Sequence, residues 1–93
     1  YKRQGDNNLF SAYVNIDHHN VVGDHCTFGP MVATSGTVRI GSRVQFGAGI
    51  VIEPYVQVGD EARIASGAVI TRDIASRATV KARPGSVVRP PRG

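Results

Sequence analysis

The chain has 93 residues and a formal net charge of +4, with one cysteine and no tryptophan. A globular core of this size would be marginal, and no apolar run is long enough to span a membrane. Because there is a single cysteine and no secretory signal pattern, we expect a reduced, cytoplasmic protein.

The first residues read as a corner that leads into a strand. Residues 5–8 are Gly-Asp-Asn-Asn, a composition suited to a tight bend, and the apolar pair Leu9 and Phe10 follows. We therefore expect the chain to begin partway through a coil of something longer.

From Leu9 onward the chain repeats every six residues. The second place of each hexad is bulky and apolar in ten of eleven cases, with Thr34 as the exception, and the sixth place is small or β-branched except at Asn20. The second place holds Phe10, Ile16, Val22, Phe28, Thr34, Ile40, Phe46, Ile52, Val58, Ile64 and Ile70, and the sixth runs from Val14 to Ile74. An unbroken repeat of fixed period indicates a solenoid.

The spacing predicts the shape of one coil. Places six, one and two form a short strand, as in residues 38–40, with the outer two side chains inward and the middle one outward. Places three to five form corners, which are rich in Gly, Pro and Asp. Three hexads make a triangular coil of eighteen residues, and Phe10, Phe28 and Phe46 recur at that interval.

The predicted fold is therefore all-β: a single-stranded parallel β-helix of about four coils, built from hexapeptide repeats. We expect the β-helix over residues 1–74, and a last partial coil with a short, irregular, basic tail containing proline over residues 75–93. A β-sandwich of short strands is the alternative, but its turns would vary in length.

The outward middle places fall on three faces. One face reads Asn15, Ala33, Val51 and Val69, whereas the other two carry Arg39 and Gln57 or Gln45 and Arg63 among their members. Only the first face has an apolar outward run, so we expect it at or near a contact between subunits.

Positive charge is concentrated in the last third of the chain. Residues 63–93 contain seven Lys or Arg against one acid, whereas residues 1–62 contain four against six. Such a cluster attracts a phosphorylated cofactor, a nucleic acid or an acidic surface, unless it is only a solvated tail. It contains no aromatic residue, so we do not expect a nucleic-acid partner.

Three segments carry a family resemblance: residues 14–24, residues 35–41 and residues 67–74. Their hexads, and the pair Asp17-His18 followed by Ser35-Gly36, resemble the bacterial hexapeptide-repeat acyltransferases, most closely the sugar O- and N-acetyltransferases related to sialic acid O-acetyltransferase. The resemblance implies a left-handed winding, a homotrimer without a membrane partner, and acetyl-CoA as donor. The acceptor would be an amine or hydroxyl of a sugar or nucleotide sugar.

The resemblance also implies roles for individual residues. His18 would act as general base on the acceptor, Asp17 would orient it, and the N–H of Gly36 would bind the thioester oxygen. Attack would be direct, because Cys26 lies in an inward place and neither it nor Ser35 has an adjacent base.

The donor would contact a further set of residues. Thr27 stands where the subgroup often has a second histidine, and the closing segment keeps a proline but lacks the usual lysine. The expected cofactor-binding residues besides Gly36 are Thr27, Ser66, Arg72, Lys81 and Arg83.

Two other functions remain open on the sequence. The chain could be a noncatalytic trimeric module or a transferase fragment, because the fold alone does not establish activity. With His18, His19 and His25 within eight residues, it could also resemble the γ-class carbonic anhydrases. The histidine spacing does not match that class, however, and we expect no bound metal.

Overall fold

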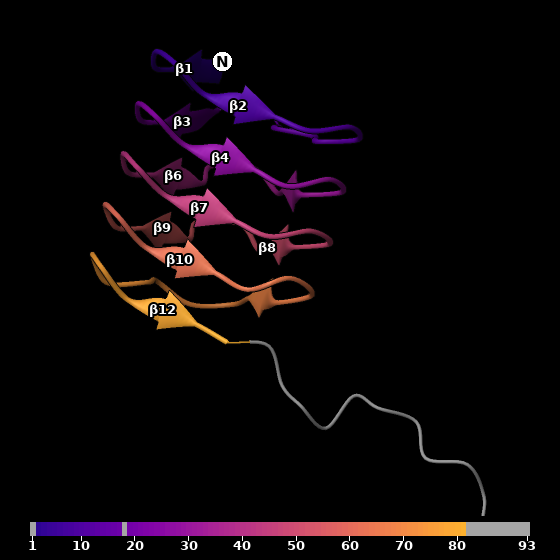
Figure 1. The fold of residues 1–93 in the computed structure, drawn as a ribbon. Helices are drawn as coiled ribbons and strands as arrows, with labels where there is room; N and C mark the ends of the chain where they lie inside the picture. The colour runs from indigo at the N-terminus through magenta and orange to yellow at the C-terminus, as the bar shows by residue number, and fades with distance from the viewer. Residues whose placement is uncertain (1, 18, 82–93) are drawn as a thin grey trace, which may run out of the picture.

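The computed structural model describes residues 2–17 and 19–81. Within them the chain forms strands of two or three residues that lie in three parallel sheets (Figure 1). Face A contains β1 (Lys2–Gln4), β3 (Asn20–Val22), β6 (Arg39–Ile40) and β9 (Gln57–Val58); face B contains β2 (Leu9–Phe10), β4 (Thr27–Phe28), β7 (Gln45–Phe46), β10 (Arg63–Ile64) and β12 (Thr79–Val80); face C contains β5 (Ala33–Thr34), β8 (Val51–Ile52) and β11 (Val69–Ile70).

The strands stack with the predicted interval of eighteen residues. Val21 pairs with Arg39, Thr27 with Gln45, and the face C strands follow the same register. In Figure 1 the chain descends from left to right along the front strands and returns behind them, which is a left-handed winding. The fold is thus the left-handed parallel β-helix of about four coils, as predicted, and the described residues contain no helix that could cross a membrane.

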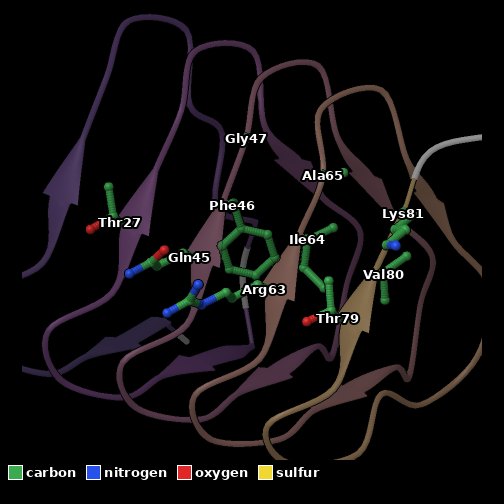
Figure 2. A pocket seen from close by; sticks show the side chains of 10 residues that line it. All are labelled: Thr27, Gln45, Phe46, Gly47, Arg63, Ile64, Ala65, Thr79, Val80 and Lys81. Carbon is green, nitrogen blue, oxygen red and sulfur yellow. The ribbon is translucent and has the colours of Figure 1, made fainter.

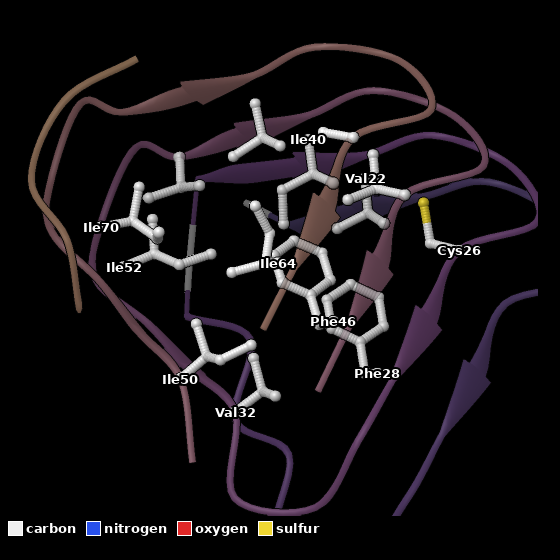
Figure 3. Packing of buried hydrophobic residues seen from close by; sticks show 14 of the residues in the cluster. Val22, Cys26, Phe28, Val32, Ile40, Phe46, Ile50, Ile52, Ile64 and Ile70 are labelled. Carbon is white, nitrogen blue, oxygen red and sulfur yellow. The ribbon is translucent and has the colours of Figure 1, made fainter. Parts of the chain in front are cut away.

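The core is a column of inward side chains from places two and six, as Figure 3 shows. Phe28 stacks between Phe10 and Phe46 with ring centroids 4.8 Å apart on each side. That distance is the spacing of hydrogen-bonded strands, so the aromatic column follows directly from the coil repeat. Phe28 is fully buried whereas Phe10, in the first coil, is 40% exposed.

The corners share one backbone conformation. Every sixth residue from Asn7 to Gly67 has a positive φ of 59° to 80°, and so does Arg77. We name the corners by the faces they join: the A/B, B/C and C/A edges. On the A/B edge a Cβ on Gly41 or Gly59 would lie within 3 Å of backbone atoms of the next coil, so these corners stack too closely for a side chain at that place.

The last coil departs from the predicted frame. The hexads place Ile74 one coil after Val56, but it bridges Val58 instead, and Arg63 pairs with Thr79. Both intervals are sixteen residues, because the final C/A corner is two residues short. The carboxylate of Asp73 compensates by accepting a hydrogen bond from the N–H of Gln57 at 2.9 Å. The predicted basic tail, residues 82–93, lies outside the described residues.

Candidate active site

The C/A edge carries the predicted catalytic corner. His18 lies outside the described residues, but its neighbours Asp17 and His19 are both exposed on this edge. The register is eighteen residues on both sides of this corner, as the pairs Asn15–Ala33 and Val21–Arg39 show. Gly36 therefore belongs to the corner one coil further along the same edge.

Gly36 occupies the fourth place of its hexad, whereas Gly41 and Gly59 on the A/B edge occupy the third. No atom of a described residue lies within 4 Å of the position where its Cβ would stand, so space is open there. No described residue accepts a hydrogen bond from its N–H. One coil further the corresponding residue is Pro54, whose side chain has no acceptor, so the hydrogen bond made at this place on the other edges is missing.

A buried polar network joins the two successive C/A corners. Asn20 and Thr34 are the two buried polar residues among those the structure describes. The side-chain amide of Asn20 donates to Thr34 Oγ1, which also accepts from the N–H of Asp17 at 3.1 Å. Asn20 Oδ1 accepts from the N–H of Val38 at 2.7 Å.

A second group of predicted residues lies on face B. A groove of about 510 Å³ lies along this face. Figure 2 shows side chains that line it, among them Thr27, Gln45, Arg63, Thr79 and Lys81. Its lining includes two cations and no acid, so it favours an anionic ligand.

Face A has a groove of similar size with a different charge pattern. It measures about 550 Å³, and Arg39 and Asp73 both line it. A cation and an acid thus share this lining, whereas the face B groove is purely cationic. Of the two, the face B groove is the better match for the phosphates of a donor.

Of the remaining predicted donor residues, the structure describes one on the B/C edge and one on the C/A edge. Ser66 lies on the B/C edge, where its Oγ accepts a hydrogen bond from the N–H of Ala48 at 2.9 Å. Arg72 lies in the shortened C/A corner and is exposed, and Arg83 lies outside the described residues. The structure thus brings Gly36 and Asp17 to one edge and Thr27 and Lys81 to the opposite face, and their roles in binding stay predictions.

Neither nearby histidine nor the cysteine adds to this site. His19 and His25 flank β3 and lie on different edges, and no three His, Cys, Asp or Glu of the described residues are grouped as metal ligands. Cys26 is buried, as expected from its inward place, with Sγ 3.1 Å from the carbonyl of Gly41. Burial raises the pKa of the Cys26 thiol above its ordinary value, which keeps it a weak nucleophile.

The repeat itself matches a known family. Residues 37–72 match the family model described as bacterial transferase hexapeptide (six repeats). The hexapeptide resemblance seen in the sequence is therefore confirmed, over a segment that includes Thr37 and Arg72 but not the corner at residues 17–20.

Two individual proteins extend this result. The chain is 46% identical over 37 residues to acyl-[acyl-carrier-protein]–UDP-N-acetylglucosamine O-acyltransferase of Helicobacter pylori (strain Shi470). The matched segment is 40% of this chain and 14% of that protein. The crystal structure of serine acetyltransferase isoform 3 from Entamoeba histolytica, in complex with cysteine, has a TM-score of 0.82 at 20% identity. The superposition covers 96% of this chain and 36% of that structure. The two proteins therefore share this fold.

Sequence reasoning missed the Asn20–Thr34 pair and the place of Arg63 in the groove. The two polar residues were visible as the single exceptions in their columns, but they are fourteen residues apart and only the coil geometry brings them together. Arg63 follows Thr27 by two coils on one outward row, so the eighteen-residue interval could have predicted their shared face.

Proposed function

We propose that this chain is the hexapeptide-repeat part of an acyltransferase that moves an acetyl group from acetyl-CoA to an amine or hydroxyl of a sugar. The open corner at Gly36 carries the proposal. Its N–H is without a described acceptor, no described atom beyond its chain neighbours lies near its Cβ position, and the residues that follow it, 37–72, match a transferase family. The chain spans only part of its relatives, so the activity and the substrates belong to this proposal.

The reaction is a direct attack in which His18 accepts the proton of the acceptor. The nucleophilic oxygen or nitrogen bonds to the thioester carbonyl carbon, the carbonyl oxygen gains negative charge, and the N–H of Gly36 stabilises it. Collapse of this tetrahedral intermediate breaks the carbon–sulfur bond and expels the thiolate of CoA, which takes from His18 the proton that the acceptor gave up. Asp17 orients the imidazole.

The donor and the base need two copies of the chain to meet. Gly36 and the face B groove lie on opposite sides of one prism, so the cationic groove serves the C/A edge of a neighbouring copy. In a cyclic trimer the contact joins two different surfaces. We place face C of one copy against face B of the next, with the B/C edge toward the axis.

The exposed apolar residues favour this arrangement. Val51 and Val69 on face C are 45% and 60% exposed, and Tyr13 and Met31 on the B/C edge are 86% and 66% exposed. Burial of these side chains between copies removes apolar surface from water.

Release of free thiol from acetyl-CoA in the presence of amino sugars and sugar alcohols tests the proposal. We expect His18→Ala to lose at least about a hundredfold in kcat, the usual contribution of a general base. Sedimentation should give the mass of three copies for both the unaltered protein and His18→Ala, which would show that the lost turnover is not a loss of assembly.

Other outcomes would identify the competing functions. Full turnover by His18→Ala would remove the base assignment. A trimer that releases no thiol from either acetyl-CoA or an acylated carrier protein would favour a noncatalytic module instead. Activity with the carrier protein alone would keep the transferase and correct the donor.

A further inference from the structure

The buried pair Asn20 and Thr34 interrupts an otherwise apolar core. One coil further, the same two places hold Val38 and Ile52, and both are fully buried. The repeat therefore accommodates an apolar pair at these two places. Polar groups that leave water need hydrogen bonds merely to recover their lost hydration, so packing alone does not explain Asn20 and Thr34.

The network joins both ends of the corner at residues 17–20 to the next C/A corner along the chain, which contains Gly36. Thr34 Oγ1 accepts from the N–H of Asp17, at the start of the corner of residues 17–20, while Asn20 at its end donates to the same oxygen. Asn20 Oδ1 then accepts from the N–H of Val38, which ends the corner containing Gly36. Three hydrogen bonds thus tie the two successive C/A corners together, where an apolar pair would provide only van der Waals contact.

A comparable asparagine exists on another edge. Asn8 occupies the same sixth place on the A/B edge, where its Oδ1 accepts from the N–H of Cys26 at 2.7 Å and its amide donates to the carbonyl of Gly23 at 2.9 Å. It also links successive corners, but it has no threonine partner and is only partly buried. Asn8 is therefore a natural control for the effect of a corner asparagine as such.

We infer that Asn20 and Thr34 are positioning residues that set the spacing between the corner of the general base and the corner of the oxyanion donor. The inference rests on the proposed acyl transfer. The pair makes no contact with substrate. Its hydrogen bonds hold the backbone at Asp17 and Val38, and the position of the backbone there sets the positions of the two corners. A rate that depends on an aligned base and donor is sensitive to shifts of about 1 Å in their separation.

Variants at these two places separate positioning from stability. In the full-length protein with acetyl-CoA, we expect Asn20→Val and Thr34→Val each to lower kcat by about tenfold to a hundredfold, with KM for acetyl-CoA nearly unchanged. Thr34→Ser keeps the hydroxyl and should restore most of the rate.

The double variant Asn20→Val/Thr34→Val gives the sharpest result. It creates the apolar pair used one coil further and removes both buried side-chain polar groups, although the N–H of Val38 loses its acceptor. It should stay folded at the assay temperature while its kcat stays low. Asn8→Val should lower the melting temperature and leave kcat unchanged.

Two results would overturn the inference: recovery of full kcat by the folded double variant, or an equal loss of kcat in Asn8→Val. If the unaltered protein releases no thiol at all, the proposed function fails and the inference fails with it, which distinguishes that case from the other two.

Discussion

The A/B and C/A edges of this β-helix are built from the same hexads, but they differ in how the N–H groups of their corners are hydrogen-bonded. On the A/B edge each described fourth-place N–H donates to a side chain in the next coil: Asp6 to Asp24 at 2.7 Å, Asp24 to Ser42 at 3.0 Å, Ser42 to Asp60 at 2.8 Å and Asp60 to Ser76 at 3.2 Å. On the C/A edge the fourth place holds Gly36 and Pro54, and no such ladder connects them.

The backbone hydrogen bonds between successive corners also differ between the two edges. The N–H of Arg43 and of Glu61 lie 2.8 Å from the carbonyls that they bond on the A/B edge, whereas the N–H of Tyr55 lies 3.4 Å from the carbonyl of Gly36. The A/B edge thus uses its polar groups to hold coils together. The C/A edge leaves groups at Gly36 available to a ligand and fixes its corners from inside, through Asn20 and Thr34.

The largest expected effect comes from removing one N–H on the C/A edge. Gly36→Pro deletes the proposed oxyanion donor at a place where the repeat already uses proline, at Pro54 on the same edge and Pro30 on the B/C edge. We expect kcat to fall by about a hundredfold to a thousandfold with little change in melting temperature. Unchanged thiol release would show that Gly36 has no part in catalysis.

A smaller effect is expected on the free energy of unfolding when a corner glycine of each edge is changed to alanine. Gly59→Ala puts a methyl group 2.4 Å from the N–H nitrogen of Ser76, so we expect the free energy of unfolding to fall by about 1–3 kcal/mol. Gly36→Ala meets no described atom and should unfold as the unaltered protein does. Urea denaturation of both variants measures the difference, and equal losses would contradict the contrast between the crowded third place at Gly59 and the uncrowded fourth place at Gly36.

The smallest expected effect tests the ladder itself. Ser42→Ala removes the acceptor of the Asp24 N–H on an exposed corner, and we expect a loss of about 1 kcal/mol in the free energy of unfolding. Ser35→Ala, on the C/A edge, is the control because its hydroxyl bonds to no described residue. If both serines cost the same, the ladder does not stabilise the A/B edge.

The sequence was sufficient to predict the regular coils, but it did not predict the shortened last coil. The column of Phe10, Phe28 and Phe46 and the three outward rows follow from periodicity, because identical coils stack in register. Ile74 was placed wrongly, since an isoleucine suits the second and the sixth place equally and nothing in the composition marks the missing two residues.

The candidate site was predictable only in part. The eighteen-residue interval places Gly36 one coil beyond the corner at residues 17–20, and the open space beside Gly36 agrees with an approach by a ligand. The partnership of Asn20 with Thr34 depends on which side chains face each other across neighbouring coils, which a linear pattern does not encode. The role of His18 stays a prediction.

The left-handed corner conformation has a consequence for how this molecule comes apart. Ten described residues other than glycine hold a positive φ, a conformation that costs an L-residue about 1–2 kcal/mol. No single turn recovers that energy alone, since the compensating contacts come from the turn above and the turn below. A turn that has a neighbour on only one side therefore unwinds more easily than a turn between two others.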